Sequence, residues 1–251
     1  YHDRFVDGLT HLTGAKPHEV VAMNGLTVNL HLLLISFYNP KAGRTKILCE
    51  AKAFPRDRYA LCSQIKLHGG NPATDLVEVA PRDGEHHLRT EDIVAAIQET
   101  GDALATVMIG GVNYYTGQLH DMEGITRAAH KVGATCGFDL AHTMGNVPLE
   151  LHNWDVDYAC WCSYKYLNSG PGAVSGVFIH ERHVRDAQGL GTAMQRLEGW
   201  WGHDAESRFQ MAPDFVPMPS AEAWQMSNAP VLNMAVHKVA LDLFLSVGIS
   251  A

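Results

Sequence analysis

Short apolar runs alternate with longer segments of helical periodicity along most of the chain. The strand-like runs are Lys46 to Glu50, Leu76 to Ala80, Ala103 to Ile109, Ala134 to Asp139, Asp155 to Trp161 and Ala173 to His180. The segments with a helical pattern are Leu26 to Phe37, Arg56 to His68, Thr90 to Thr100, Asp121 to Val132 and Ala229 to Val247. Strands that alternate with helices in this way predict an α/β fold, in which helices cover both faces of a mainly parallel sheet.

No repeat, low-complexity tract or linker interrupts this alternation, so we expect the 251 residues to form one domain. A domain of this length buries roughly three quarters of the surface that its unfolded chain exposes, which is enough for one large core. The stretch from Met211 to Pro219 is rich in proline and follows neither period. It predicts a loop that reaches over the functional site or toward a partner subunit.

The charge balance excludes two classes of partner. The chain carries 19 Lys and Arg against 27 Asp and Glu side chains. Nucleic acids and anionic membranes attract concentrated basic residues, so neither is expected to bind. No apolar segment reaches the roughly eighteen residues that indicate a membrane span, and the first residues lack a signal pattern.

Cysteine and histidine usage favours a reduced protein without a metal. Five cysteines, an odd number, are scattered through apolar runs, which is typical of reduced thiols and predicts a cytoplasmic location. Among the fifteen histidines no pair has a compelling metal-ligand spacing. Cys160 and Cys162 lie across a predicted buried strand without a second cysteine pair, so we expect no zinc site.

An acid and a lysine stand at the ends of two successive apolar runs. Asp139 ends the run from Gly133 to Phe138, and Lys165 follows the run from Val156 to Trp161. Strand carboxyl ends form the edge of an open α/β sheet at which ligands bind. Pyridoxal phosphate (PLP) needs such a pair, because its aldehyde forms a Schiff base with a lysine amine and its protonated ring nitrogen needs a fixed carboxylate. For an arbitrary Asp and Lys, a turn cap and a solvated lysine are the commoner roles, so the surrounding sequence has to decide.

Two further segments fit a cofactor with a phosphate and a flat ring. Gly25 and Thr27 come at the start of a long apolar helical pattern, and free N–H groups at a helix start bind phosphate. Thr27 equally suits an ordinary helix N-cap. Phe54, just before Pro55, is placed either to stack on a pyridine ring or to fill the core.

In this order, these pieces resemble the kynureninases, PLP enzymes of the aspartate-aminotransferase-like fold type I that are related to the class V aminotransferases. The resemblance runs over nearly the whole chain and is carried by the segments Met23 to His31, Glu50 to Pro55, Gly137 to His142, Trp161 to Asn168 and Gly199 to His203. It implies a mixed, mainly parallel sheet of the seven-stranded type, sandwiched by helices. Residues 1–251 would then be the PLP-binding large domain, a fragment without the N-terminal segment and most of the small C-terminal domain.

The resemblance also implies a role for each residue of a cofactor cage. Lys165 would form the Schiff base, Asp139 would pair with the ring nitrogen, and Phe54 would stack on the ring. Leu26 and Thr27 would hold the phosphate at their helix start.

An outer set of residues matches further family positions. Tyr164 would bind the phosphate and transfer protons, and Asp57 and His142 would lie close to the ring. Trp200 would reach the cofactor from the neighbouring subunit of a homodimer, whose active site lies near the interface. Some relatives carry a serine at the position of Gly110, so one hydrogen bond to the cofactor is expected to be absent.

The substrate end of the site follows from the same resemblance. Ser227 and Asn228 would meet the aromatic end of the substrate, and Asn228 would also contact the cofactor. Without the resemblance, Trp200 reads equally as half of a packed pair with Trp201, and Tyr164 as a buried structural tyrosine.

The implied reaction is hydrolysis of the carbon–carbon bond of L-kynurenine, or 3-hydroxykynurenine, to anthranilate, or 3-hydroxyanthranilate, and L-alanine, in tryptophan catabolism and NAD biosynthesis. By the same resemblance, the preference between the two substrates would depend partly on side chains that precede Tyr1. The family's arginine for the substrate carboxylate would belong to a C-terminal region that residues 1–251 do not include.

Three alternatives compete with this assignment. A cysteine desulfurase or selenocysteine lyase shares the fold, but usually has a histidine directly before the Schiff-base lysine, where this chain has Tyr164. A nicotinamide dehydrogenase would need a glycine-rich turn between a strand and a helix, whereas Gly170 and Gly172 precede a predicted strand. The non-enzymatic alternative is an inactive truncated fold that binds PLP or a partner.

Overall fold

The central element is a mixed sheet of seven strands. The computed structural model describes residues 2–41, 43–184 and 194–249. The strands are β1 (Val20–Ala22), β2 (Lys46–Glu50), β3 (Leu76–Val79), β4 (Leu104–Gly110), β5 (Thr135–Asp139), β6 (Tyr158–Trp161) and β7 (Gly176–Ile179). Their order across the sheet is β1-β7-β6-β5-β4-β2-β3, in which β2 to β6 run parallel and β7 pairs antiparallel with both β6 and β1. The predicted α/β class with a mainly parallel, mixed sheet is therefore confirmed.

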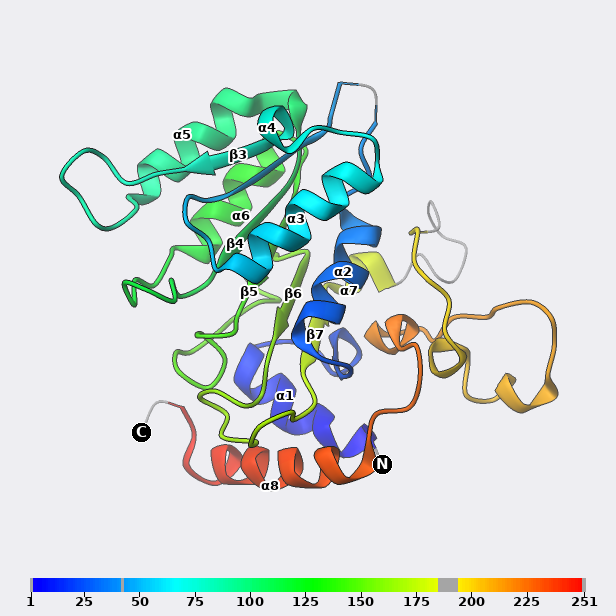
Figure 1. Cartoon of the computed structure of the whole chain (residues 1–251). Helices are drawn as coiled ribbons and strands as arrows, with labels where there is room; N and C mark the ends of the chain where they lie inside the picture. Colours follow the sequence, from blue (N-terminus) through cyan, green and yellow to red (C-terminus); the bar gives the residue numbers. More distant parts are fainter. Residues whose placement is uncertain (1, 42, 185–193, 250–251) are drawn as a thin grey trace.

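Helices cover both faces of this sheet (Figure 1). They are α1 (Val6–Thr13), α2 (Leu26–Phe37), α3 (Pro55–Leu67), α4 (Pro72–Asp75), α5 (Thr90–Thr100), α6 (Met122–Lys131), α7 (Glu181–Val184) and α8 (Val231–Val247). Short 3-10 turns span His2–Phe5, Pro17–Glu19, Gly101–Ala103, Trp200–Gly202, Arg208–Gln210 and Ala221–Trp224. Helices α2 and α3 pack on one face of the sheet, and helices α1, α5, α6 and α8 pack on the other.

Two apolar clusters, one on each face, make up the core. Along β6 the side chains alternate between them, since Ala159 and Trp161 belong to one cluster and Tyr158 and Cys160 to the other. A strand buried on both faces reads as a continuous apolar run. This is why the interior strands were predictable from the sequence to within a few residues.

All the predicted strands and helices form, with bounds that differ from the predictions by at most about three residues, and α2 and α5 span the predicted residues. The short elements α1, α4, α7 and β1 were missed. β1 has only three residues, too few for a period to show, and it forms because the β7 edge provides antiparallel partners for Val20 and its neighbours. α1 is short and is anchored by the burial of Leu9 and Leu12 rather than by a strong local signal.

The proline-rich segment from Met211 to Pro219 forms the expected loop. It is joined to the preceding turn by an isolated bridge between His203 and Pro217 and by the bond from Met218 N–H to the Gly202 carbonyl. In Figure 1 this part of the chain projects away from the sheet. Two cavities, described below, lie at the carboxyl ends of the strands, and no residue of this loop lines either of them. Within this chain, the loop therefore does not reach over the site.

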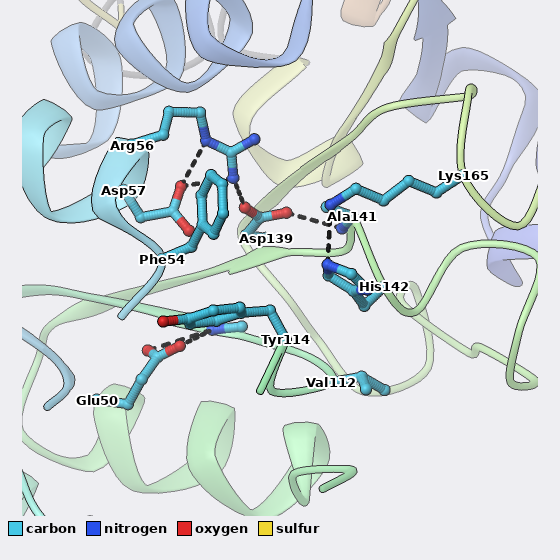
Figure 2. Close-up of a pocket in the computed structure, with 11 residues that line it drawn as sticks. Glu50, Phe54, Arg56, Asp57, Val112, Tyr114, Asp139, Ala141, His142 and Lys165 are labelled. Atoms are coloured by element: carbon cyan, nitrogen blue, oxygen red, sulfur yellow. Dashed lines mark hydrogen bonds and ion pairs between the residues drawn. The ribbon is translucent and has the colours of Figure 1, made fainter. Parts of the chain in front are cut away.

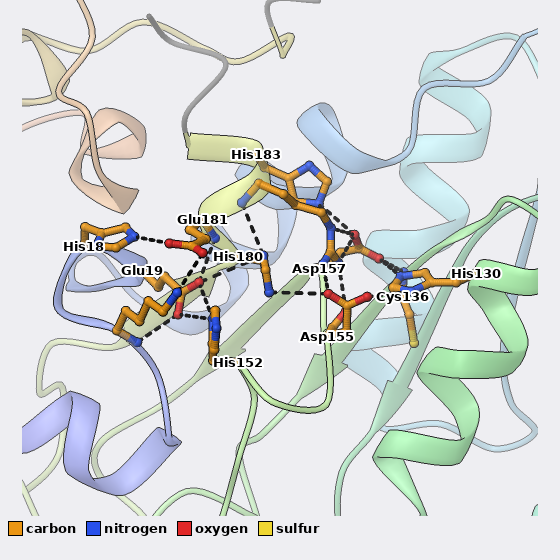
Figure 3. A network of polar contacts seen from close by, with 12 residues as sticks. His18, Glu19, His130, Cys136, His152, Asp155, Asp157, His180, Glu181 and His183 are labelled. Carbon is orange, nitrogen blue, oxygen red and sulfur yellow. Dashed lines mark hydrogen bonds and ion pairs between the residues drawn. The ribbon is translucent and has the colours of Figure 1, made fainter. Parts of the chain in front are cut away.

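A network of histidines and acids closes the opposite edge of the sheet (Figure 3). Asp157, just before β6, is buried and accepts hydrogen bonds from the ring of His130, from His183 and from the Arg182 guanidinium. Burial alone would raise the pKa of Asp157, but these partners hold the pKa of its carboxyl well below the usual range. The network therefore fixes a charged acid where β6 begins.

The same edge holds a second buried acid. The Glu19 carboxylate accepts the N–H groups of Lys16 and Glu181 at 2.8 and 2.7 Å, and it pairs with the His152 ring at 2.9 Å. His152 and His180 stack with ring centroids 4.8 Å apart. Glu19, His152 and His180 are one of three groups in the described residues whose atoms are close enough to share a metal ion. Because backbone N–H groups already satisfy Glu19, we interpret this cluster as a structural clamp between β7 and the segment before β1.

The described helices include none that is both long enough and apolar enough to cross a membrane. All five cysteines are unpaired, and Cys62 is the one that is not fully buried. The cytoplasmic location stays a prediction.

We predict that His237 makes the fold sensitive to acid. Its ring lies buried in α8 against Phe5, and its Nδ1 is 2.8 Å from the Ser169 hydroxyl. Burial lowers the pKa of His237 to about 4 from 6.5. The unfolded chain therefore binds the proton first, so stability is complete above pH 6.5 and is lost as the pH falls toward 4, by about 3 kcal/mol at most.

Chemical unfolding of the His237→Gln variant between pH 7 and pH 4 tests this prediction. Its free energy of unfolding should fall less over this range than that of the parent protein, because glutamine does not titrate. The matched control is His11→Gln, on the exposed side of α1. Equal slopes for His237→Gln and the parent protein would contradict the prediction.

Candidate active site

Three neighbouring strands end in residues that face one pocket. Gly110 at the end of β4 lies opposite Asp139 at the end of β5, and β2, on the other side of β4, ends at Glu50. The Glu50 carboxylate is buried and lies 3.3 Å from the Gly110 N–H. Parallel pairing therefore brings residues far apart in the sequence to the edge where α/β sheets bind ligands.

We call the depression at this edge the inner pocket (Figure 2). Its lining residues are Glu50, Phe54, Arg56, Asp57, Gly110, Val112, Tyr114, Asp139, Ala141, His142 and Lys165. Six residues predicted to contact a cofactor are among them, namely Phe54, Asp57, Gly110, Asp139, His142 and Lys165. The structure thus brings together the acid and the lysine that the sequence placed 26 positions apart.

Lys165 points into the inner pocket from the loop after β6. Its Nζ lies 2.8 Å from the Nε2 atom of His142 and 5.7 Å from the centre of the Phe54 ring. Burial lowers the pKa of the Lys165 amine. The nearby Cys162 thiol opposes this shift, and the Arg56 charge adds to it. Burial also lowers the pKa of His142, with Lys165 and Arg56 adding to the effect. An amine with a lowered pKa is more easily freed of its proton to act as a nucleophile.

Asp139 is a buried acid with both oxygens engaged. Its Oδ1 accepts the Ala141 N–H at 2.7 Å, and its Oδ2 forms an ion pair with the Arg56 guanidinium. The same guanidinium also bonds to Asp57, at 2.6 and 2.9 Å. Burial raises the pKa of Asp57 and the Arg56 charge opposes the rise. Figure 2 shows Asp139 between Arg56 on one side and the pair of Lys165 and His142 on the other.

Phe54 presents its ring to the pocket rather than to the core. It is the N-cap residue of α3, and Pro55 begins the helix. A tight turn with Lys52 in the left-handed region, at φ 56°, reverses the chain between β2 and this helix. The ring is 39% exposed and meets Tyr114 edge-on, with centroids 5.2 Å apart. The alternative of a buried core phenylalanine is therefore wrong.

The start of α2 opens onto a second, larger space, the outer cavity, of about 750 Å³. α2 begins at Leu26, and Gly25 is its N-cap residue without a side-chain hydrogen bond, so the alternative that Thr27 is the N-cap is wrong. The first N–H groups of a helix have no partner within it and attract anions. A side chain at Gly25 would meet only open space. The helix start is therefore accessible to a phosphate.

The outer cavity gathers most of the remaining predicted residues. Its lining residues are Asn24, Gly25, Leu26, Thr27, Val28, Phe54, Arg56, Tyr164, Gly172, Ala173, Val174, Ser227, Asn228, Ala229 and Pro230. Phe54 and Arg56 line both spaces, so the two adjoin. Tyr164 is 45% exposed, which rules out the alternative of a buried structural tyrosine. Burial and the Cys162 thiol together raise the pKa of its phenol.

Trp200 is the one predicted contact residue that the structure leaves outside both spaces. Its ring is 47% exposed and meets Phe209 edge-on at 6.0 Å. Trp201 instead packs against the Arg208 guanidinium at 4.3 Å. The aromatic contacts described for these two rings therefore do not pair Trp200 with Trp201, as the alternative of a packed pair would require.

Sequence reasoning gave no role to Glu50, Arg56 and Tyr114, which the fold brings into the inner pocket. Glu50 had a signal, since it ends the apolar strand run from Lys46 just as Asp139 ends its own. For Arg56 the sequence offered no signal other than its closeness to Phe54. Gly110 lies close to this acid, because a Cβ there would come within 3.1 Å of Glu50 Oε1. A serine at this position would press on the Glu50 carboxylate.

Comparisons with known proteins place the chain in a family. The fold is similar to that of a solved cysteine desulfurase from Thermococcus onnurineus NA1, at a TM-score of 0.76, 17% identity and coverage of 99% of this chain and 57% of that one. An alanine–glyoxylate aminotransferase from Nostoc sp. matches at a TM-score of 0.66 and 18% identity, over 99% of this chain and 60% of the other. These likenesses show the fold. The family model for class V aminotransferases matches residues 9–218, and the chain belongs to that family.

Relatives named kynureninase are far more similar in sequence. The kynureninase of Flavobacterium johnsoniae is 54% identical over all 251 residues, and that of Nematostella vectensis is 50% identical over 96% of the chain. This chain spans 58% and 51% of the length of these two proteins. The resemblance inferred from the sequence is therefore confirmed.

We predict that Glu50 weakens the fold at alkaline pH. Burial raises the pKa of Glu50 to about 7 from 4.5, against the hydrogen bonds of its own backbone and of Gly110. The folded state holds this proton more tightly than the unfolded chain. The stability that follows is complete below pH 4.5 and is lost as the pH rises through about 7, by about 3 kcal/mol at most.

Thermal unfolding of the Glu50→Gln variant between pH 5 and pH 9 checks this. The variant should lose less stability over that range than the parent protein, because the amide stays neutral and its oxygen can still accept the Gly110 N–H. The control is Glu91→Gln on the exposed start of α5. A Glu50→Gln variant that follows the parent curve would refute the role of this carboxyl.

Proposed function

We propose that the inner pocket and the outer cavity together bind PLP. The residues present fit this cofactor. The buried Asp139 carboxylate already forms an ion pair with a cation, the Arg56 guanidinium. The protonated ring nitrogen of PLP would be a cation of the same kind for this carboxylate. The ring of Phe54 faces the pocket. The Lys165 amine, whose pKa is lowered by burial, lies 5.7 Å from the centre of that ring. The uncapped start of α2 offers N–H groups to a phosphate in the adjoining cavity.

Bound PLP would supply an aldehyde that condenses with amines and a protonated ring that accepts an electron pair. Lys165 would hold the aldehyde covalently, Asp139 would keep the proton on the ring nitrogen, and Phe54 would stack on the ring. Leu26 and Thr27 would hold the phosphate at the start of α2. These roles rest on the positions of the side chains around one space.

We propose further that the whole protein is a kynureninase, which hydrolyses L-kynurenine or 3-hydroxykynurenine to anthranilate or 3-hydroxyanthranilate and L-alanine. The observation that carries this proposal is the convergence of Lys165, Asp139 and Phe54 on one pocket, beside a cavity that Tyr164 and Asn228 line. The 54% identity to a protein named kynureninase supports it.

The chain's own residues divide the work of this reaction. The Lys165 amine would take the proton from the substrate α-carbon, since its lowered pKa makes the neutral, proton-accepting form easier to reach. His142, at hydrogen-bond distance from that amine, would orient it. Tyr164 opens onto the outer cavity, where its phenol would pass a proton as water adds to the side-chain ketone. Ser227 and Asn228 line the same cavity and would meet the aromatic ring of the substrate.

We also propose a homodimer with the site near the interface. Trp200 lines neither space in its own chain and is half exposed, so it is free to complete the site of a second subunit. Residues 1–251 would be the PLP-binding large domain of this protein, and its location would be the cytoplasm.

A desulfurase activity is the second candidate, but no residue favours it. The solved cysteine desulfurase shares the fold at 17% identity, and a shared fold does not define a reaction. The residue before Lys165 is Tyr164, not histidine. L-Cysteine therefore serves as the comparison substrate, and sulfide release without anthranilate release would favour this alternative.

The Lys165→Ala variant should neither release anthranilate nor retain PLP covalently. The amine is the group that would bond to the aldehyde, and the neighbouring His142 cannot replace it at that position. Anthranilate fluorescence with L-kynurenine measures the first effect in the whole protein. Borohydride reduction followed by peptide mass spectrometry measures the second. Lys131→Ala, on the exposed end of α6, is the control. Unchanged anthranilate release by Lys165→Ala would sink the assignment.

The Asp139→Asn variant should bind PLP about ten- to a hundredfold more weakly, since a charge-assisted hydrogen bond to a buried group contributes about 1.5–3 kcal/mol. The Ala141 N–H can still be accepted by the asparagine oxygen, so the loop after β5 should keep its shape. Equilibrium titration of the cofactor-free protein with PLP gives the affinity. A normal affinity would refute the role of Asp139.

A further inference from the structure

Arg56 is a largely buried cation at the junction of the two spaces. Like Phe54, it lines both the inner pocket and the outer cavity, and only 16% of its side-chain surface is exposed. The guanidinium bridges two buried acids, Asp139 and Asp57, and lies 5.4 Å from the centre of the Phe54 ring. Figure 2 shows it beside the ring of Phe54, on the side of Asp139 away from Lys165.

The bonding of Asp139 leaves one oxygen that a ligand can take. Oδ1 accepts a backbone N–H from Ala141, which moves only if the loop after β5 moves. Oδ2 is held by Arg56, a long side chain from the first turn of α3. A ring cation that pairs with Asp139 must therefore compete with the guanidinium for Oδ2. Two cations beside one carboxylate repel each other, so both cannot hold it equally well.

Arg56 has a place to go when it is displaced. Its Nε donates to Asp57 at 2.9 Å, whereas its Nη2 contacts both Asp57, at 2.6 Å, and Asp139. The Nε bond to Asp57 does not depend on the contact with Asp139. The outer cavity, which Arg56 also lines, gives room for the guanidinium to turn away from Asp139 while it keeps this pairing. The exchange thus breaks one ion pair and leaves the other in place.

We propose that Arg56 is an internal competitor of the cofactor, a resident cation that holds Asp139 in the cofactor-free protein and that the protonated ring nitrogen displaces. This rests on the proposed PLP site. Arg56 stabilises the cofactor-free fold, because without it two buried acids would lose the cation that both of them bind. It also weakens cofactor binding, since its ion pair with Asp139 is lost in the complex. Arg56 is thus a positioning residue that sets the affinity for PLP.

The test removes the charge of Arg56 and measures binding without turnover. Cofactor-free Arg56→Gln is titrated with PLP and with 4-deoxypyridoxine 5′-phosphate, which keeps the ring nitrogen and the phosphate but has no aldehyde for Lys165. We expect both to bind about tenfold more tightly than to the parent protein, the effect of losing one competing hydrogen bond between charged groups. The melting temperature of the cofactor-free variant should fall, and that of the PLP complex should fall less.

Two further variants separate charge from packing. Arg56→Met keeps an apolar stem beside Phe54 without the charge, so it should reproduce the tighter binding and serves if Arg56→Gln does not fold. Arg58→Gln is the matched control, because Arg58 lies one position beyond Asp57 on α3 but pairs with Glu78 on the surface. Its affinity for both probes should equal that of the parent protein.

Weaker binding of both probes to Arg56→Gln and Arg56→Met would overturn the proposal, since Arg56 would then hold the bound cofactor instead of competing with it. Unchanged affinity would also overturn it. If no form of the protein binds PLP, the proposed function fails and this inference fails with it. If the parent protein binds PLP as tightly as Arg56→Gln and Arg56→Met do, this inference is refuted and the proposed function is not.

Discussion

The candidate site depends on the parallel pairing of β5 with its two neighbours. Gly110 of β4 lies opposite Asp139, and the ladder continues past the strand end, where the Gly111 N–H bonds to the Asp139 carbonyl and the Leu140 N–H to the Cys160 carbonyl. These bonds fix the backbone of a buried acid at 2.9 and 2.8 Å. Every other group of the inner pocket is placed relative to that acid, because strands packed on both faces cannot shift without exposing the core.

The acids of the inner pocket outnumber its Arg and Lys cations. Three buried acids, Glu50, Asp57 and Asp139, share a small volume with the cations Arg56 and Lys165. Burial raises the pKa of Glu50 and lowers the pKa of Lys165, so both groups move toward the neutral form. Groups shifted in this way are concentrated at functional sites. A cation brought in by a ligand therefore enters a site that already has partners for it and a competitor to displace.

The two edges of the sheet use similar residues for different purposes. At the carboxyl edge, Oδ2 of Asp139 and the His142 ring bond to side chains that can move, while Oδ1 of Asp139 accepts the Ala141 N–H. At the opposite edge, Asp157 and Glu19 are bonded to backbone N–H groups as well as to histidines, as Figure 3 shows. A carboxylate oxygen held by a backbone N–H cannot easily change partners, so at the carboxyl edge it is Oδ2 of Asp139 that can exchange its partner. Several histidines of the chain thus have structural contacts, and the residues proposed to carry the chemistry lie at the other edge.

The sequence by itself determined the fold class, the interior strands and the pair of Asp139 and Lys165, because buried parallel strands read as continuous apolar runs and end at an edge that ligands use. The resemblance to kynureninases decided between the alternatives for Thr27 and Phe54 and added Tyr164, Asp57 and His142. Local patterns could not show that β1 forms, since its three residues are a strand only beside β7. Nor could they show that Glu50 and Arg56 enter the pocket. Their roles follow from distances between residues remote in sequence, and only the packing of α3 against the sheet, which aims Arg56 at Asp139, sets those distances.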